Sequence, residues 1–273
     1  MDADDLLAAE LARETGELLV RLRESMGFAD PRALRNAGDR QAHELLVAQL
    51  GERCPDDVVL SEEAADPAAR LSAPRVWIVD PLDGTREFGE AGRTDWAVHV
   101  ALWERSSSVA AGRLAAGAVA LPALGVVLST ADDRRHLPRE AGQVSPLPRQ
   151  AGQASAEPPR VVVSRTRPST EAMRVVEALE ATPVPMGSVG AKVGAVIQGE
   201  AEVYVHSGGQ YQWDSAAPVA VALAAGLHAS RLDGSPLEYN GPDLSVPDLL
   251  VCRPELALPV LAALRDRSAG DAR

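Results

Sequence analysis

Asp80-Pro81-Leu82-Asp83-Gly84-Thr85 is the stretch of this chain that decides its fold and its site. It directly follows an apolar run, Val-Trp-Ile-Val at 76–79, whose pattern predicts a buried β-strand. Two carboxylates three residues apart therefore leave the end of a strand on a tight turn. Carboxylate oxygens suit a hard divalent cation, and Gly84 lets the backbone approach a ligand closely. We expect Thr85 to begin a helix whose free N–H groups can hold a phosphate oxygen.

The tripeptide Asp-Gly-Thr has two other interpretations. On its own it is most often only a turn. It also occurs in the haloacid dehalogenase motif Asp-x-Asp-Gly-Thr, whose first aspartate is phosphorylated during the reaction. Here two residues, Pro81 and Leu82, separate the carboxylates where that motif has one. Pro81 would also place a rigid unit without an N–H donor after the nucleophile, so the spacing argues against a phosphoaspartate enzyme.

Further acidic residues stand at ordered positions along the chain. Asp39 heads a helical pattern, where an N-cap is expected. Glu62 and Glu63 follow a short strand predicted at 58–61. Asp214 comes at the start of a predicted helix, directly after Trp213. An aspartate at a helix start also caps the helix for stability alone, so a functional assignment depends on the joint pattern.

In chain order these elements resemble the signature of the lithium-sensitive, magnesium-dependent phosphomonoesterases, the inositol monophosphatase superfamily. That signature is an aspartate, a Glu-Glu pair, Asp-Pro-(Ile/Leu)-Asp-Gly-(Ser/Thr), and Trp-Asp followed eleven residues later by Gly-Gly. One position departs: Leu227 follows Gly226 where the second glycine is expected, at a helix C-terminus rather than at a ligand. The matching elements span Asp39 to Gly226, most of the chain. The resemblance implies a layered α/β/α/β/α sandwich.

The resemblance also implies a site that holds two or three Mg²⁺ ions. The implied ligands of the first ion are Glu63, Asp80 and the backbone carbonyl of Leu82, and those of the second are Asp80, Asp83 and Asp214. The implied catalytic residues are Glu63 and Thr85, which orient the attacking water, and Asp39, which fixes Thr85 from behind. Glu62 is assigned a place behind the ligands. The implied substrate contacts are Glu63, Asp83, Gly84, Thr85, Arg86, Ser188, Lys192 and Asp214.

The chemistry explains why about four carboxylates are needed. A phosphate monoester resists attack by water because its phosphoryl group is already anionic. A two-metal site clamps the attacking and leaving oxygens and generates hydroxide near neutral pH. The backbone N–H groups of Gly84 and Thr85 would receive the phosphate.

Residues around the ligands bear on which phosphate ester is bound. Arg86 and Glu87 resemble the Thr-Lys-Glu-Phe stretch of bacterial 3′(2′),5′-bisphosphate nucleotidases, whereas inositol monophosphatases carry Thr-Thr-Asn-Phe. Ser188 to Lys192 resemble the Gly-Ser-x-x-x-Lys stretch of the same nucleotidases, and Lys192 could neutralise a second phosphate. The alternative for Arg86 and Lys192 is an ordinary solvated surface charge.

The sequence therefore predicts an enzyme, a Mg²⁺-dependent phosphomonoesterase that removes the 3′-phosphate of 3′-phosphoadenosine 5′-phosphate, a by-product of sulfate activation. One alternative on the same scaffold is a broadly specific inositol-phosphate or fructose-1,6-bisphosphate phosphatase, because the metal site contacts only the phosphate. An alternative from another class is a non-enzymatic Mg²⁺- or nucleotide-binding regulator. Its mark would be a lost ligand, and the sequence retains every expected ligand.

Composition and charge limit the partners. The net charge of −12 argues against a protein that binds nucleic-acid polymers, which would need a basic face. Cys54 and Cys252 lie far apart and suggest neither a disulfide framework nor a metal site. The acidic N-terminus lacks a signal-peptide pattern, and no apolar run approaches the length of a membrane span. We expect a cytoplasmic protein that binds a small phosphate ester, and a homodimer is left open.

The chain divides into three predicted parts. Residues 1–137 show runs of strands with two helices, an α+β half that holds most of the metal ligands. Residues 138–159 repeat Pro-Arg-x-Ala-Gly-Gln-x-Ser, which is too rich in Pro, Gly and Gln to bury much and predicts a flexible loop. Residues 160–273 alternate strands and helices, an α/β half that holds Asp214 and the specificity residues. His99, inside an apolar strand, is predicted to be a buried core histidine.

Overall fold

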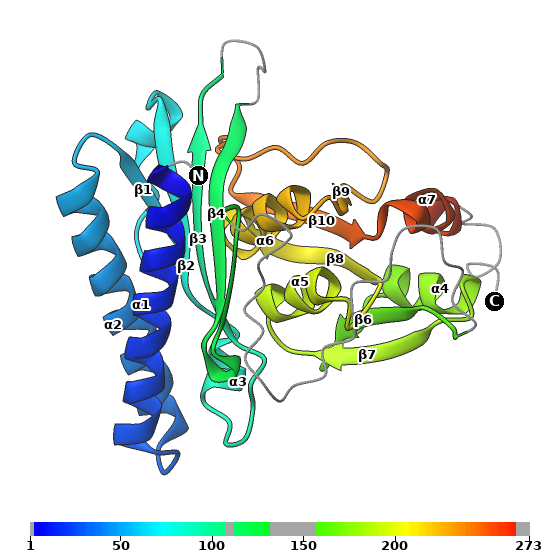
Figure 1. Cartoon of the computed structure of the whole chain (residues 1–273), viewed down its shortest axis with the longest axis horizontal. Helices are drawn as coiled ribbons and strands as arrows, with labels where there is room; N and C mark the ends of the chain where they lie inside the picture. Colours follow the sequence, from blue (N-terminus) through cyan, green and yellow to red (C-terminus); the bar gives the residue numbers. More distant parts are fainter. Residues whose placement is uncertain (1–2, 107–111, 132–156, 266–273) are drawn as a thin grey trace.

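The computed structural model describes residues 3–106, 112–131 and 157–265. Figure 1 shows five stacked layers, in which pairs of helices alternate with two sheets. The helices of the outer, middle and far layers are, in that order, α1 (Ala3–Met26) with α2 (Pro31–Arg53), α5 (Val189–Gln198) with α6 (Gln212–Ala224), and α4 (Thr170–Ala178) with α7 (Ala257–Arg265). The α/β/α/β/α sandwich expected from the sequence is thereby confirmed.

The first sheet carries the strand that ends at the central motif. Its strands, in spatial order, are β1 (Val58–Ser61), β2 (Arg75–Asp83), β3 (Ala97–Glu104), β4 (Arg113–Leu121) and β5 (Val126–Ser129). β1 runs parallel to β2 and all other neighbours are antiparallel. The residues of β2 from 76 to 83 are all buried, as the apolar run predicts, because helices cover both faces of the sheet. Three short 3₁₀ turns accompany the strands and helices, at Ala68–Leu71, Pro122–Leu124 and Pro254–Leu256.

The second sheet is mixed. Its spatial order is β7 (Thr182–Met186), β6 (Arg160–Ser164), β8 (Val203–Tyr211), β10 (Ser245–Cys252) and β9 (His228–Ser230). β7, β6 and β8 run parallel, and β10 is antiparallel to both β8 and β9. The sequence analysis did not anticipate β7, which contains Pro183 and Pro185. Proline is tolerated there because β7 is an edge strand whose outer N–H groups need no partner in the ladder.

The helix expected to begin at Asp39 begins nine residues earlier, so the prediction of a cap at Asp39 is wrong. α2 starts at Asp30-Pro31, where Asp30 Oδ1 accepts the N–H groups of Arg32 (3.1 Å) and Ala33 (3.0 Å). Asp39 therefore lies in the middle of α2. Gly38 does not break the helix; a Cβ there would stand 2.8 Å from both Leu82 and Phe88. The glycine is needed for close packing of α2 against the central motif.

Small side chains hold the middle layer close to the first sheet. α6 is buried along nearly its whole length and contributes several alanines to the core. A Cβ at Gly117 of β4 would stand 2.7 Å from the Cβ of Ala220, so helix and strand are in tight contact. A core poor in aromatic residues allows this close contact, because the small side chains of alanine and valine permit a short distance between helix and sheet. Among the helices that the structure describes, none is both long and apolar enough to cross a membrane.

The two halves of the chain share one core. All strands of the first sheet precede residue 130 and all strands of the second follow residue 159. Ile78 and Val119 of the first sheet nevertheless lie in the same apolar cluster as Tyr204 and Trp213. Residues 138–156 of the predicted loop at 138–159 lie outside the described residues. The division of the chain into two halves at this loop therefore stays a prediction.

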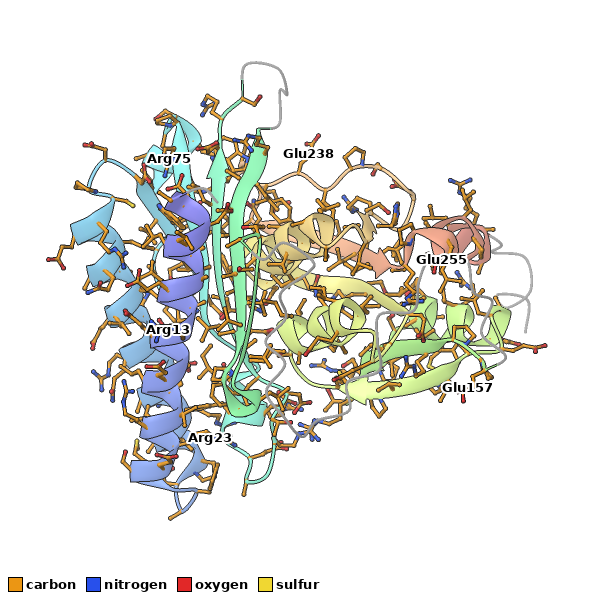
Figure 2. All side chains as sticks on the ribbon, viewed as in Figure 1. Arg13, Arg23, Arg75, Glu157, Glu238 and Glu255 are labelled. Atoms are coloured by element: carbon orange, nitrogen blue, oxygen red, sulfur yellow. The ribbon has the colours of Figure 1, made fainter. Side chains whose placement is uncertain are left out.

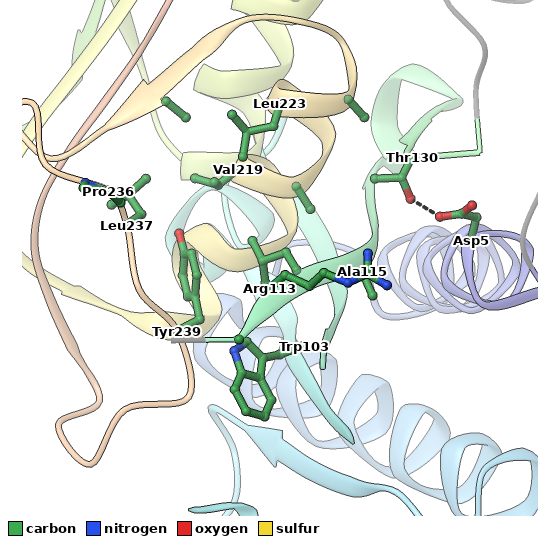
Figure 3. A pocket seen from close by; sticks show the side chains of 15 residues that line it. Asp5, Trp103, Arg113, Ala115, Thr130, Val219, Leu223, Pro236, Leu237 and Tyr239 are labelled. Carbon is green, nitrogen blue, oxygen red and sulfur yellow. Dashed lines mark hydrogen bonds between the residues drawn. The ribbon is translucent and has the colours of Figure 1, made fainter. Parts of the chain in front are cut away.

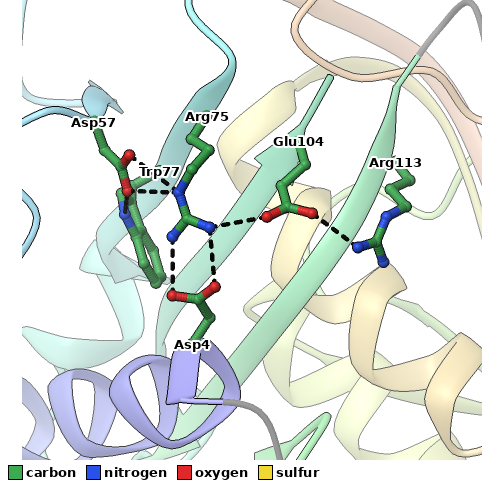
Figure 4. Close-up of polar contacts among 6 residues, drawn as sticks. All are labelled: Asp4, Asp57, Arg75, Trp77, Glu104 and Arg113. Atoms are coloured by element: carbon green, nitrogen blue, oxygen red, sulfur yellow. Dashed lines mark hydrogen bonds and ion pairs between the residues drawn. The ribbon is translucent and has the colours of Figure 1, made fainter. Parts of the chain in front are cut away.

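Arginines connect segments that are distant in the sequence. Figure 4 shows the Arg75 guanidinium between the carboxylates of Asp4, Asp57 and Glu104, with Nη1–Oε1 of Glu104 at 2.8 Å and Nη2–Oδ1 of Asp4 at 2.9 Å. This joins the start of α1 to β2 and β3. Arg23, labelled near the far end of α1 in Figure 2, donates to the carbonyls of Glu90 (2.8 Å) and Arg93 (3.1 Å). These contacts anchor the segment that follows the central motif.

Arg70 is the most completely enclosed of these cations, with a fully buried side chain. Its Nη2 lies 3.0 Å from Asp66 Oδ2, and its Nη1 donates to Asn240 Oδ1 (3.0 Å) and to the carbonyl of Gly241 (2.8 Å). The Asn240 N–H in turn donates to Gln212, the first residue of α6, at 2.6 Å. One guanidinium thus fixes the segment after Glu62-Glu63 against the start of the helix that carries Asp214.

Replacing Arg70 by alanine should destabilise the fold by about 1–3 kcal/mol, because the buried Asn240 side chain and the Gly241 carbonyl lose their charged donor. Urea unfolding of Arg70→Ala measures this loss. The matched control is Arg40→Ala, since the side chain of Arg40 is 62% exposed in its pair with Glu44, and that change should cost less than about 1 kcal/mol. Equal losses in the two variants would contradict the structural role of Arg70.

Candidate active site

Asp80 and Asp83 stand at the end of β2, where the ladder with β3 is irregular. Asp80 pairs with His99 across the ladder and Asp83 with Ala97, so the register shifts between the two aspartates. Asp80 Oδ1 accepts the N–H of Leu82 at 3.0 Å. Gly84 has φ +82°, a left-handed conformation that favours glycine, and α3 (Thr85–Phe88) begins directly after it. The expected helix start at Thr85 is confirmed, although the helix has only four residues.

Asp214 reaches the same place from the other half of the chain. From the sequence, Asp214 was expected to head the helix. It is instead the third residue of α6. Its Oδ2 accepts the N–H of Tyr211 at 2.6 Å, which stabilises the first turn. Within the described part of the chain, one oxygen each of Asp80, Asp83 and Asp214 lies within 4.8 Å of the other two. Two carboxylates from β2 of the first sheet and one from helix α6 of the middle layer therefore share one small space.

The charges of these carboxylates are unequally compensated. Burial raises the pKa of Asp80 well above its usual value, and the nearby charges of Glu62 and Asp83 raise it further. Burial, followed by the charge of Asp83, raises the pKa of Asp214 to about 6. Burial also opposes the ionisation of Asp83, but His99 and the Gly190 amide outweigh it and hold its pKa below the usual value. Asp83 is thus the carboxylate whose negative charge is stabilised by neighbouring groups of the protein itself.

Glu62, Glu63 and Asp39 complete the acidic surroundings. Glu62 is exposed as a residue, but its carboxyl group is partly desolvated beside Asp80. This desolvation raises its pKa to about 7, although a hydrogen bond with Asp80 opposes the rise. Glu63 is exposed and lies outside the group of three aspartates. Burial, then the charge of Glu63, raises the pKa of Asp39 to about 6. Glu62 therefore approaches Asp80 more directly than the sequence suggested.

The hydroxyl of Thr85 lies between Asp39 and the central motif. Thr85 Oγ1 is 3.0 Å from the carbonyl oxygen of Leu82 and 3.3 Å from Asp39 Oδ1. The structure therefore brings together the pair Asp39–Thr85 that the resemblance implied. Asp39 can do this from the middle of α2 because Gly38 lets the helix approach the motif.

The predicted specificity residues differ in their surroundings. Arg86 is exposed, as expected for a solvated charge. Lys192 is not: it is only 4% exposed, and its Nζ lies 5.3 Å from the centre of the Tyr204 ring. Burial lowers the pKa of Lys192, while the charge of Asp83 opposes that shift. Ser188 caps α5 by accepting the N–H of Ala191 at 2.9 Å, so its side chain already has a structural role.

Contacts that the sequence analysis missed hold this segment in place. Arg165, at the end of β6, lies 2.6 Å from Glu87 Oε1 and 3.1 Å from Glu90 Oε1. The carboxylate of Asp95 accepts the N–H of Gly187 at 2.6 Å. These contacts tie the segment before α5 to the segment after the central motif. No local sequence pattern could have found them, because each joins residues more than seventy positions apart.

A separate cavity of about 510 Å³ lies elsewhere in the molecule. Figure 3 shows its lining side chains, among them Trp103, Arg113, Leu223 and Tyr239. It borders the C-terminal part of α6, whereas Asp214 stands in the first turn of that helix. None of the three clustered aspartates lines it. The carboxylate cluster, and not this cavity, is therefore the candidate active site.

The cluster fits divalent cations by the chemistry of its donors. Hard cations such as Mg²⁺ take carboxylate and carbonyl oxygens, and such oxygens come here from Asp80, Asp83, Asp214 and the backbone of Leu82. The raised pKa values of Asp80 and Asp214 show that the protein alone does not balance the negative charge. The class of the protein is thereby defined as a five-layer α/β/α/β/α sandwich whose two halves meet at an acidic cluster compatible with a metal ion.

Comparisons with known proteins agree with that class. The chain belongs to the inositol monophosphatase family, whose model matches residues 7–269. It is 50% identical over 266 residues to a 3′-phosphoadenosine 5′-phosphate phosphatase of Mycobacterium leprae, covering 96% of this chain and 94% of the relative. It is 32% identical over 240 residues to the 3′(2′),5′-bisphosphate nucleotidase CysQ of Escherichia coli K12, covering 85% and 92%. A crystal structure of CysQ from Bacteroides thetaiotaomicron matches with a TM-score of 0.71 at 26% identity, covering 92% of this chain and 97% of that one.

The raised pKa of Asp214 predicts how the stability of the metal-free protein depends on pH. A carboxyl whose pKa rises on folding binds its proton more tightly in the folded state. Its stabilising contribution is therefore complete below the unfolded value near 3.8 and is lost as the pH rises through about 6. The full penalty for the ionised form is at most about 3 kcal/mol.

In a chelating buffer, Asp214→Asn should therefore unfold at a higher temperature than the unmodified protein at about pH 7.5, because the amide carries no charge to be repelled. The difference should shrink as the pH falls toward about 4, where the aspartate is neutral too. Thermal unfolding across this range measures it. A difference that does not change with pH would show that Asp214 is not under electrostatic strain.

Proposed function

We propose that this chain is a Mg²⁺-dependent phosphomonoesterase that removes the 3′-phosphate of 3′-phosphoadenosine 5′-phosphate and leaves adenosine 5′-phosphate. The observation that carries the proposal is the 50% identity, over nearly the full length of both chains, to mycobacterial proteins named for that activity. The carboxylate cluster supports it, because a phosphate ester carries negative charge and needs cations beside it. In this proposal the chain acts in sulfur metabolism.

The residues that would hold the cations are Glu63, Asp80 and the Leu82 carbonyl for one ion, and Asp80, Asp83 and Asp214 for another. Bound Mg²⁺ would supply positive charge to the phosphoryl oxygens and lower the pKa of water. Glu63 and the Thr85 hydroxyl would orient the attacking water, and Asp39 keeps that hydroxyl in place through the 3.3 Å contact. The N–H groups of Gly84 and Thr85 would face the phosphate. By the same resemblance we expect Li⁺ to inhibit the enzyme.

Lys192 is the residue that we propose to recognise the second phosphate. Its burial beside Asp83 rules out the solvated surface charge considered from the sequence. Among the residues that the structure describes, no carboxylate forms an ion pair with the buried Lys192 ammonium, which is therefore available to an anionic ligand. Arg86, exposed at the start of α3, and Ser188 would line the same side of the substrate. A homodimer and a cytoplasmic location stay predictions from the sequence.

An inositol-phosphate or fructose-bisphosphate phosphatase remains the alternative on this scaffold. Solved structures titled inositol monophosphatase share the fold, for example one from Staphylococcus aureus at a TM-score of 0.71 and 22% identity, but that likeness bears on the fold alone. A panel of phosphate esters with added Mg²⁺ separates the candidates. A preference for inositol 1-phosphate over 3′-phosphoadenosine 5′-phosphate would overturn the proposed substrate and leave the cation site standing.

Asp80→Asn should abolish turnover, by at least about a thousandfold, because Asp80 would bridge the two ions and so affects both roles of the site. Mg²⁺ binding, measured by calorimetry, should weaken in parallel, while the fold is retained because the amide keeps the shape of the side chain. The control is Asp56→Asn, an exposed carboxylate of the same half. Near-normal activity in Asp80→Asn would refute the assignment of the cation site.

Lys192→Ala should lower kcat/KM for 3′-phosphoadenosine 5′-phosphate about ten- to a hundredfold, since one charge-assisted contact contributes roughly 1.5–3 kcal/mol. Hydrolysis of inositol 1-phosphate should change much less, because that ester has no second phosphate. Arg167→Ala, an exposed cation of the same half, serves as the control. Equal losses for both esters in Lys192→Ala would mean that the lysine has a structural role only.

A further inference from the structure

A single buried histidine contacts the ligand-bearing segments of both halves of the chain. His99 lies in β3 and has no solvent exposure. Its Nε2 is 3.2 Å from Asp83 Oδ2 at the end of β2. Its Nδ1 is 3.2 Å from the backbone oxygen of Trp213 in α6, the residue directly before Asp214. The ring therefore spans from the Asp83 carboxylate at the end of β2 to the backbone next to Asp214 in α6, and so it connects the two halves of the chain.

We infer that His99 is a positioning residue that fixes Asp83 and Asp214 at the separation that the cation site requires. The backbone oxygen of Trp213 can only accept a hydrogen bond, so Nδ1 is the donor in that contact. The contact between Nε2 and Asp83 is close but lacks the alignment of a hydrogen bond, and no other partner of Nε2 lies within the part of the chain that the structure describes. The inference rests on the proposed function, because it takes Asp83 and Asp214 to be cation ligands.

The segment at the start of α5 is shaped around this ring. A Cβ on Gly190 would stand 2.3 Å from His99 Nε2, so only glycine leaves room for the imidazole there. The N–H of the same Gly190 donates to Asp83 Oδ2 at 2.7 Å. One carboxylate oxygen is thus approached by an amide from α5 and a ring from β3, while the ring also reaches α6. Three elements, β3, α5 and α6, are thus connected to Asp83 of β2 through His99 and Gly190.

Packing alone does not account for a histidine at this position. The neighbours of His99 along β3 are Val98 and Val100, and the core on its own face of the strand is apolar. Burying a polar ring in such surroundings costs free energy unless its nitrogens meet partners. Both partners of His99 belong to segments that carry proposed ligands. Groups that orient metal ligands from behind typically change metal affinity ten- to a hundredfold when they are removed.

The test compares Mn²⁺ binding to His99→Leu and to the unmodified protein by electron paramagnetic resonance, a readout that does not depend on turnover. Leucine fills a similar volume without a donor, so the dissociation constant should rise about ten- to a hundredfold. His99→Asn keeps an N–H donor on a shorter side chain and should recover part of the affinity. It also provides a second measurement should the leucine variant not fold.

The matched control is Val100→Ala, which removes buried carbon from the other face of β3, in a different apolar cluster from that of Trp213. It should lower the unfolding temperature and leave Mn²⁺ affinity within about twofold, because cavity formation acts on stability. Unchanged Mn²⁺ affinity in a folded His99→Leu or His99→Asn variant would overturn the positioning role while the cation site stands. An unmodified protein that does not bind Mn²⁺ would instead overturn the proposed function, and this inference with it.

Discussion

Carboxylate crowding between the two sheets is the constraint on which the rest of the structure depends. Oxygens of three aspartates lie within 4.8 Å of one another where water screens their repulsion poorly. The chain relieves this repulsion at Asp83, through the Gly190 amide and the His99 ring, and leaves Asp80 and Asp214 with raised pKa values. The residual negative charge opposes folding of the protein alone and favours bound cations.

Much of the surrounding structure can be understood as the means of holding these groups together against their repulsion. Arg70 ties the segment after Glu62-Glu63 to the start of α6, and Arg165 ties the end of β6 to α3 and the segment after it. Each guanidinium contacts several oxygens at once, which a lysine ammonium does less well because it lacks the planar fork of donors. The cations that stabilise the fold are therefore arginines, whereas the buried lysine, Lys192, stands beside the site itself.

Local sequence patterns correctly predicted the strands before Asp80 and Glu62. They failed where the bounds or the presence of an element depend on a contact between distant segments. The apolar run before Asp80 is a strand and the short strand before Glu62 is present, since both depend on nearby residues. The head of α2 was misplaced because Gly38 resembles a helix boundary until its packing against Leu82 is known. β7 was missed because its two prolines are acceptable only at a sheet edge, and a sequence does not reveal which strand is at the edge.

By itself the sequence determined the order of the acidic residues and the donor chemistry of the site, because these depend on residue type and spacing along the chain, and its resemblance to a known superfamily implied the five-layer fold. Only the tertiary structure decided which acids meet. It brings Glu62 to Asp80, buries Lys192, and places His99 between Asp83 and the segment that carries Asp214. The physical reason is that burial and electrostatic coupling depend on which elements pack together, whether the residues are 18 positions apart, as Glu62 and Asp80 are, or 114, as His99 and Trp213 are, and no local pattern records that packing.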